Sequence, residues 1–297
     1  MRRALPALLL AVAALAGCSE AEPTPAPAPA ETTGSPTAAP TAYDQYVALG
    51  DSYTAAPLVP PTDTSTICLR SGVNYPALVA TAMAGTKLTD VSCSGATTGD
   101  IAAAQQGRTG TVPPQLDAVR RSTDLVTIGL GGNDEGLFGT VLAQCTQLGA
   151  GNPVGSPCTQ RFADGLDATL ARIHDNLVGV VDEVRTRAPH ARVLLVGYPQ
   201  IVPETGSCDD LPLADGDYAF ARQVNEGLTR TVEAAAGDAR AEYVDIWTAS
   251  AGHDICADDP WINGRVTSAS RALAYHPLAV EQQAVAGLVV DLLQSKG

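Results

Sequence analysis

The sequence predicts an α/β fold: a three-layer α/β/α sandwich around a central, mostly parallel β-sheet. Short apolar runs rich in Val, Ile and Leu recur along the chain, and longer segments with apolar residues at helical spacing lie between them. Continuous apolar strands of this kind are typical of a parallel sheet that helices cover on both faces. No internal repeat and no second domain boundary is evident, so we expect one folded domain over residues 43–297.

The predicted elements alternate in the order that this fold requires. The strands are YVALG, a weaker run TKLTDVSC, then DLVTIGLGG, ARVLLVGYP and AEYVDIW. Helices are predicted over Phe162–Arg187, Asp217–Ala236 and Pro277–Gln294, where apolar residues recur at close to helical spacing. Pro277 suits the first turn of the last helix, because its missing N–H needs no partner there.

The amino terminus has the features of an export signal. Arg2 and Arg3 precede an apolar stretch from Leu5 to Leu15, which is too short to span a bilayer comfortably. The following Ala-Gly-Cys18 completes a segment that resembles a bacterial lipobox. Residues 1–17 are therefore expected to be a lipoprotein signal peptide, with a lipid attached to Cys18. The alternative is an ordinary signal peptide followed by an unmodified cysteine.

Residues 18–42 are predicted to form a lipidated tether. Pro, Ala and Thr dominate this segment and no apolar period is present, so it cannot bury a core. The formal net charge of the chain is −14, which should repel nucleic acid and anionic lipid headgroups. We therefore expect a covalent anchor at Cys18 that places the protein at the cell surface, on the outer face of the cytoplasmic membrane.

The cysteine count predicts disulfides. Seven cysteines are present, and all but Cys18 belong to the predicted domain. An even number of cysteines in an exported chain favours disulfides, although the residues alone leave their pairing open. None of them forms a Cys-x-x-Cys motif, so no zinc site is expected. Cys145 and Cys158 bracket a loop rich in Gly and Pro that a crosslink would restrain.

Polar motifs follow the first three predicted strands. Ser52 lies in GDSY, Gly95 in SCSG and Asn133 in GGND. Sites in parallel α/β sheets form at the carboxyl ends of the strands, so the three residues are expected to converge. Each motif alone is also compatible with an ordinary turn, because Gly, Asp and Ser favour turns.

These residue types suit ester hydrolysis, which needs a nucleophile, a base and donors for the developing oxyanion. Ser52 would attack the carbonyl carbon. The N–H groups of Ser52 and Gly95 and the side-chain amide of Asn133 would bind the oxyanion. Glycine at position 95 would let the backbone approach closely. Asp51 is expected to hold the turn through hydrogen bonds to nearby N–H groups.

The base is expected to be a histidine, because an ordinary pKa of about 6.5 suits neutral pH. His253 and His276 follow the last predicted strand and are placed to reach the same edge of the sheet. His276 is favoured, because Pro277 restricts its backbone to extended conformations at the entry to a helix. His253 is the alternative.

GDSY, SCSG, GGND and the late His276-Pro277, in this order, resemble the SGNH hydrolases, also called the GDSL family, which have a flavodoxin-like fold. The likeness extends from Tyr46 to His276. It implies an esterase or lipase that acts on acyl esters or lipids through an acyl-enzyme, without metal or cofactor; we expect a monomer. The cysteines also resemble those of secreted actinobacterial members. That likeness implies the pairs Cys68–Cys93, Cys145–Cys158 and Cys208–Cys256.

The chain departs from the family pattern at one position. The family places an aspartate three residues before the histidine, where this chain has Leu273. We therefore expect a Ser52–His276 dyad, with a main-chain carbonyl of Leu273 or Ala274 orienting the histidine. The rival acids in the same loop are Asp254, Asp258 and Asp259.

Two other functions stay open at this point. The missing aspartate is compatible with a non-catalytic surface binding module on the same fold. A carbohydrate O-acetyl esterase is the other alternative, although only 4% of the residues are aromatic, which gives little support for a sugar-stacking surface.

Overall fold

The structure is a computed structural model, which describes residues 43–295. Within that range a central sheet has the strand order β2-β1-β5-β6-β7, and every pairing in it is parallel. Its strands are β1 (Gln45–Gly50), β2 (Lys87–Asp90), β5 (Leu125–Gly129), β6 (Arg192–Val196) and β7 (Glu242–Val244). The expected strands and their parallel arrangement are confirmed.

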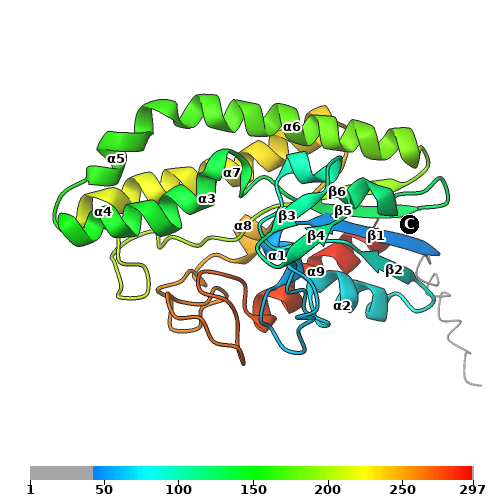
Figure 1. Ribbon diagram of the computed structural model, residues 1–297, viewed down its shortest axis with the longest axis horizontal. Helices are drawn as coiled ribbons and strands as arrows, with labels where there is room; N and C mark the ends of the chain where they lie inside the picture. Colours follow the sequence, from blue (N-terminus) through cyan, green and yellow to red (C-terminus); the bar gives the residue numbers. More distant parts are fainter. Residues whose placement is uncertain (1–42, 296–297) are drawn as a thin grey trace, which may run out of the picture. The chain divides into compact units, whose positions relative to one another are not determined.

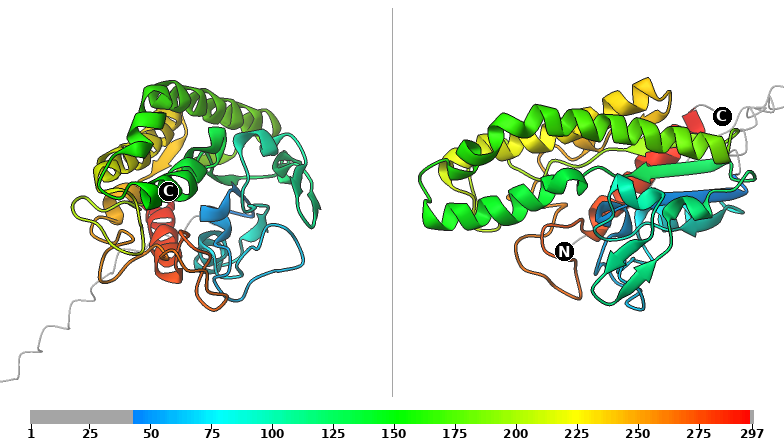
Figure 2. Two further views of the ribbon diagram at one scale, coloured as in Figure 1. Left: turned by 60° about the vertical axis from the view of Figure 1, so that its left-hand side comes forward. Right: turned by 45° about the horizontal axis from the view of Figure 1, so that its top comes forward.

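Helices cover both faces of this sheet (Figure 1, Figure 2). Helices α6 (Leu166–Arg187) and α7 (Tyr218–Asp238) lie on one face, and α2 (Tyr75–Ala82) and α9 (Ala279–Ser295) lie on the other. Alternate residues of β1 enter the two cores: Val47 and Leu49 pack with the first pair of helices, Tyr46 and Ala48 with the second. The three-layer α/β/α sandwich is therefore confirmed.

The helix boundaries differ from the sequence-based ones where a local feature intervenes. Helix α6 begins at Leu166, because α5 (Pro157–Phe162) and a 3₁₀ turn ending at Gly165 precede it. The expectation that Pro277 occupies the first turn of the last helix is wrong. Pro277 forms a β-bridge with Ile262, and α9 begins only at Ala279.

Several short elements were not expected from the sequence. An antiparallel hairpin follows β2, and a π-helical segment, η4 (Thr140–Cys145), joins two short helices after β5. The additional strands and helices are β3 (Gln105–Gly107), β4 (Gly110–Val112), α1 (Ser52–Ala55), α3 (Leu137–Gly139), α4 (Thr146–Gly151) and α8 (Ile246–Ala249). The remaining 3₁₀ turns are Thr98–Ile101, Gln115–Ala118, Asp134–Gly136 and Asp215–Asp217.

The three disulfides join the pairs that the resemblance implies: Cys68–Cys93, Cys145–Cys158 and Cys208–Cys256. All of them crosslink connections that leave the carboxyl ends of the sheet strands. A disulfide typically contributes about 2–4 kcal/mol to stability. They therefore hold in place the loops at the edge where the site is expected.

No helix within residues 43–295 is long and apolar enough to cross a bilayer. The expected signal peptide, Cys18 and the tether lie outside the described residues.

Candidate active site

Ser52 lies at the turn between β1 and α1. Asp51 caps the helix, because its Oδ1 accepts a hydrogen bond from the Tyr53 N–H at 2.8 Å. The Asp51 N–H donates to the Gly129 carbonyl at 2.9 Å, which holds the turn against β5. Ser52 is 6% exposed, and its N–H donates no hydrogen bond within residues 43–295. This N–H is therefore available to a bound oxyanion.

Gly95 lies in the loop that follows β2, close to the same turn. The Cys93 N–H donates to the Gly50 carbonyl at 2.9 Å, which joins the two loops. Gly95 has a φ of +80°, and a Cβ added there would come no nearer than 3.7 Å to Gln105. The left-handed backbone conformation therefore favours glycine at this position, and no described side chain crowds it.

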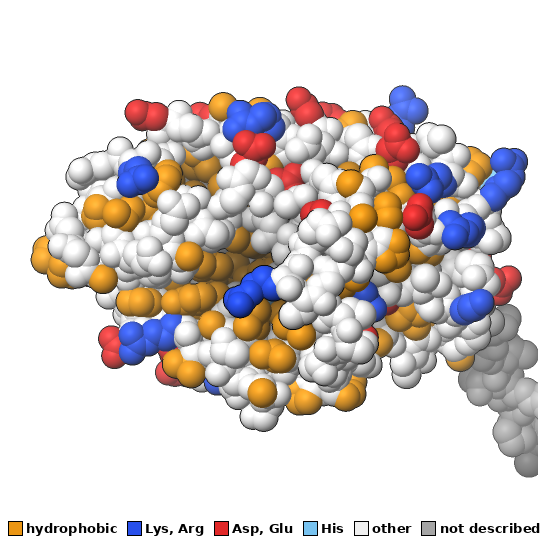
Figure 3. All heavy atoms as spheres, in the orientation of Figure 1, with side chains coloured by type: hydrophobic (Ala, Val, Ile, Leu, Met, Phe, Trp, Pro, Cys, Tyr) orange, Lys and Arg blue, Asp and Glu red, His pale blue; other side chains and the backbone are white. Residues whose placement is uncertain are grey.

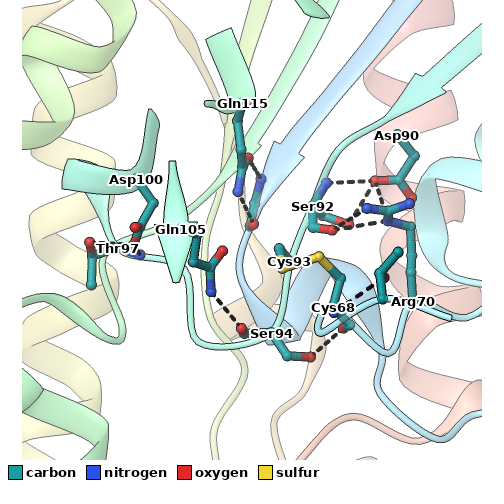
Figure 4. The surroundings of a disulfide bond; sticks show 12 residues. Cys68, Arg70, Asp90, Ser92, Cys93, Ser94, Thr97, Asp100, Gln105 and Gln115 are labelled. Atoms are coloured by element: carbon teal, nitrogen blue, oxygen red, sulfur yellow. Dashed lines mark hydrogen bonds and ion pairs between the residues drawn. A yellow bond between two sulfur atoms is a disulfide. The ribbon is translucent and has the colours of Figure 1, made fainter. Parts of the chain in front are cut away.

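The Cys68–Cys93 disulfide and two polar contacts hold the loop that carries Gly95 (Figure 4). The Ser94 hydroxyl donates to the Cys68 carbonyl at 2.6 Å, and the Ser94 carbonyl accepts from Gln105 Nε2 at 2.8 Å. Because these bonds lie directly before Gly95, they fix the direction of its N–H.

Asn133 follows β5 and lies beside the Gly95 loop. Its Nδ2 donates to the Ala96 carbonyl at 3.0 Å, and the second Nδ2 hydrogen has no partner within the part of the chain that the structure describes. The glycines before it permit this turn: Gly131 has a φ of +117°, and a Cβ on Gly132 would lie 2.4 Å from the Phe138 ring. The structure thus places Gly95 and the Asn133 amide next to each other.

His276 is held by a main-chain carbonyl. Its Nδ1 lies 2.7 Å from the Ala274 oxygen, which can only accept, so Nδ1 carries the proton. In this tautomer Nε2 keeps its lone pair. Burial lowers the pKa of His276 below its ordinary value, although the bond to Ala274 opposes this shift. The ring is therefore neutral at neutral pH and able to accept a proton on Nε2.

Contacts of Tyr53 place His276 beside the turn that carries Ser52. The Tyr53 ring centroid lies 5.8 Å from that of His276, and the Tyr53 hydroxyl donates to the Tyr275 carbonyl at 2.9 Å. Since Tyr53 directly follows Ser52, these contacts place the histidine loop beside the serine. The four candidate residues predicted from separate motifs are therefore collected at one edge of the sheet.

The alternative base and two of the rival acids, Asp254 and Asp259, have other partners. The His253 ring stacks on Trp261 at 4.6 Å, and its Nδ1 lies 3.0 Å from the Asp259 carbonyl. Asp254 accepts from the Cys256 N–H at 2.8 Å. Within residues 43–295, no carboxylate contacts His276, whose Nδ1 is bonded to Ala274.

Three residues that shape the site were missed from the sequence. Asn263 donates to the carbonyls of Ala272 and Leu273, both at 3.1 Å, and so orders the loop before His276. Gln282 on α9 donates to the Tyr53 carbonyl at 2.9 Å. Gln115 forms a pair of 2.9 Å bonds with the backbone of Gly50 (Figure 4). An isolated Asn or Gln carries no sequence signal for such a role.

Asp51 has a second partner that the sequence did not indicate. Its Oδ2 accepts from the Tyr198 hydroxyl at 2.6 Å, in addition to the expected bond from the Tyr53 N–H. Burial raises the pKa of Asp51 to about 7, and the two hydrogen bonds oppose that rise. Asp51 is thus a buried structural group of the turn.

A small apolar pocket of about 10 Å³ lies beside this cluster. Hydrophobic side chains gather in a hollow below α3 and α4 in the view of Figure 3. The pocket is bounded by Phe138, Val141, Leu142, Ile201, Val202, Ala221, Val224 and Asn225. Phe138 connects it to the site, because its ring packs 5.4 Å from Tyr53. Two larger cavities, of about 350 and 410 Å³, are lined by none of the candidate catalytic residues.

Comparison with known proteins identifies relatives over most of the chain. The model of the GDSL-like lipase/acylhydrolase family matches residues 48–280. Lipase 2 of Streptomyces coelicolor is 41% identical over 84% of this chain and 85% of that protein. The crystal structure of an extracellular lipase from Streptomyces rimosus matches with a TM-score of 0.69 and 32% identity, over 84% of this chain and 99% of that chain.

A second solved structure, phospholipase A1 from Streptomyces albidoflavus, has a TM-score of 0.67 and 30% identity, over 85% of this chain and all of that chain. The family model spans the segments that carry Ser52, Gly95, Asn133 and His276. The chain therefore belongs to the GDSL-like lipase/acylhydrolase family, and it is a carboxylic ester hydrolase.

Proposed function

We propose that the chain hydrolyses acyl esters through a Ser52–His276 dyad and a covalent acyl-enzyme. One observation carries this proposal: His276 Nδ1 is bonded to the Ala274 carbonyl, which leaves the Nε2 lone pair to accept a proton. A carbonyl can fix the tautomer as a carboxylate does, although it stabilises the imidazolium less.

The reaction proceeds in two halves. Ser52 Oγ attacks the ester carbonyl while its proton moves to His276 Nε2. The N–H groups of Ser52 and Gly95 and the amide of Asn133 bind the oxyanion. The imidazolium then protonates the leaving alcohol, and an acyl-Ser52 ester remains. Nε2 then takes a proton from a water molecule as the water attacks this ester, and the imidazolium returns the proton to Ser52 Oγ as the carboxylic acid leaves.

The apolar surface beside Phe138 favours an acyl chain as the part of the substrate that is bound (Figure 3). The residues that gather there are apolar except for Asn225, so they offer few partners for a sugar hydroxyl. Contact of a chain with such a surface contributes about 0.8 kcal/mol for each CH₂ group that is buried. The relatives named lipase and phospholipase A1 agree with this substrate class.

A substrate series tests the proposed function. Rates are measured on p-nitrophenyl esters from acetate to palmitate and on an acetylated xylo-oligosaccharide, with Ser52→Ala as the blank. We expect kcat/KM to rise with chain length beyond acetate. A preference for the acetylated sugar over every aliphatic ester would favour a carbohydrate O-acetyl esterase, and no turnover of any ester would contradict the proposal.

Asn133→Ala should lower kcat by about 10²–10³, the usual loss for one oxyanion donor. KM should change little, because the bond strengthens only in the transition state. Steady-state kinetics on one p-nitrophenyl ester measure both constants. A rise in KM with kcat unchanged would instead make Asn133 a substrate-binding residue.

We also propose that the protein is exported and anchored by a lipid on Cys18. The lipobox-like segment and the three disulfides, which suit an oxidising compartment, support this. Because the charge of the chain opposes adsorption to anionic lipid, the anchor has to be covalent.

Cys18→Ser should prevent lipid attachment. Cells producing either form are labelled with radioactive palmitate, and we expect label in the wild-type chain only. The variant should also leave the membrane fraction or stay unprocessed. Equal labelling of the two forms would contradict the lipobox assignment.

A further inference from the structure

The Tyr198 hydroxyl forms a bridge between two of the loops at the site. It donates to Asp51 Oδ2 at 2.6 Å and accepts from the Gly132 N–H at 2.9 Å. Asp51 directly precedes Ser52, and Gly132 directly precedes Asn133. One hydroxyl group therefore joins the residue before the nucleophile to the residue before the oxyanion-binding amide.

The bridge formed by the Tyr198 hydroxyl is buried and restrained by its surroundings. Tyr198 is 1% exposed, so water has no ready access to replace its hydroxyl. Its ring packs against Phe138 at 5.1 Å and Tyr53 at 5.4 Å, in both cases edge to face. The Thr229 hydroxyl lies 3.3 Å from the Tyr198 nitrogen and 3.2 Å from its carbonyl oxygen, which restrains the backbone as well.

We propose that Tyr198 is a positioning residue that sets the spacing between the Ser52 turn and the Asn133 amide. This inference rests on the oxyanion roles proposed above. The donors come from loops after three different strands, and an oxyanion requires all of them within about 2.7–3.1 Å of one point. The Tyr198 bridge bonds two of these loops directly, so its loss lets them separate without removing any donor.

Tyr198→Phe tests the proposal, because it removes the hydroxyl and keeps the ring. We expect kcat on a p-nitrophenyl ester to fall about 10- to 100-fold, less than or equal to the loss from deleting a donor outright. KM should stay within about threefold, because the misplaced groups act in the transition state.

Tyr46→Phe is the matched control. Tyr46 is 0% exposed, and its hydroxyl lies 2.8 Å from Thr127 Oγ1 in the core on the α2 and α9 side of the sheet. The control loses a buried hydroxyl and its hydrogen bond, as Tyr198→Phe does, but should keep kcat within about twofold. Both variants are assayed well below their own melting temperatures, so that a loss of stability does not lower the rate.

A second readout separates positioning from general stability. An alkyl boronic acid forms a reversible tetrahedral adduct with a serine and places a charged oxygen where the oxyanion would lie. Its Ki should rise in Tyr198→Phe by about the factor by which kcat/KM falls, whereas the Ki of a fatty-acid product should not change. Tyr46→Phe should leave both constants unchanged.

Asp51→Asn covers the case in which Tyr198→Phe fails to fold. The amide oxygen still accepts from the Tyr53 N–H, but the amide nitrogen can only donate to the Tyr198 oxygen, so a weaker neutral bond replaces the bond from the hydroxyl to the carboxylate. Asp51→Asn should lower kcat by more than twofold but less than Tyr198→Phe does, and the double variant should lose no more than the more affected single variant. Tyr198→Phe with kcat and boronate Ki within twofold of wild type would overturn the proposal, and so would a folded Asp51→Asn of full activity.

The proposed function has its own test in Ser52→Ala. An inactive Ser52→Ala with a fully active Tyr198→Phe would contradict only the positioning role. An active Ser52→Ala would contradict the proposed mechanism whatever Tyr198→Phe does.

Discussion

Ser52→Ala should abolish ester hydrolysis, with a residual rate below about one per cent of wild type. The serine oxygen forms the bond to the acyl carbon, and loss of the nucleophilic serine lowers kcat by about 10⁶ in the serine protease subtilisin. The substitution keeps Cβ and the cap from Asp51, and the Ser52 hydroxyl bonds to no other described residue. The fold should therefore survive, as circular dichroism and the melting temperature would verify.

Ser250→Ala is the control for this variant. Ser250 is fully buried, and its hydroxyl accepts from the Gln200 N–H at 2.8 Å, away from the Ser52 turn. It should lower stability and leave kcat within a few fold of wild type. Ser52→Ala with more than a few per cent of wild-type activity would place the nucleophile elsewhere.

His276→Ala should lower kcat by about 10³ or more, because the variant has no general base for either half of the reaction. His253→Ala should stay within about tenfold, since the His253 ring stacks on Trp261 and its Nδ1 is bonded to Asp259. Both variants are compared with wild type on the same p-nitrophenyl ester at neutral pH.

Substitution of the aspartates in the loop before His276 distinguishes a Ser–His dyad from a triad. Asp254→Asn, Asp258→Asn and Asp259→Asn should each stay within about tenfold of wild type, far from the loss of about 10⁴ that follows removal of a triad carboxylate. A thousandfold loss in any one of them, in a folded protein, would mean that this aspartate completes a triad.

The pH dependence of kcat/KM should also identify His276 as the base. The reactive form of His276 is neutral, so kcat/KM should rise with pH as the ring loses its proton and then level off. Because burial lowers the pKa of His276, this rise should lie below the ordinary value of about 6.5. The pH profile of His276→Ala should lack this rise in kcat/KM.

The parts of the fold that the sequence predicted are those with a local pattern. Strand β5 is a short run of buried apolar residues, and α6 buries a stripe from Ile173 to Val184 on one face. A continuous apolar run indicates a strand that is buried on both faces, and an apolar stripe indicates a helix that is buried on one face. Both patterns can be recognised without knowing which residues pack against them. The motifs of Ser52, Gly95 and Asn133 were predictable because each follows one of the predicted strands.

The parts that were missed depend on partners that lie far along the chain. The Tyr198–Asp51 bond joins residues 147 positions apart, and Gln282 bonds to Tyr53 across 229 positions. Neither side chain differs locally from an ordinary core tyrosine or helix glutamine. The conformation of Pro277 was missed because its bridge partner, Ile262, lies 15 positions earlier in the irregular connection between α8 and α9, where no periodicity indicates a pairing.

Covalent labelling tests the dyad mechanism most directly. A p-nitrophenyl alkylphosphonate transfers its alkylphosphonyl group to the nucleophile of a serine hydrolase and releases p-nitrophenol, and the labelled peptide is identified by mass spectrometry. We expect one label for each chain, on Ser52, with labelling of His276→Ala slower by about 10³, in line with its loss of kcat. A label on any residue other than Ser52, or equal labelling rates for wild type and His276→Ala, would contradict the mechanism.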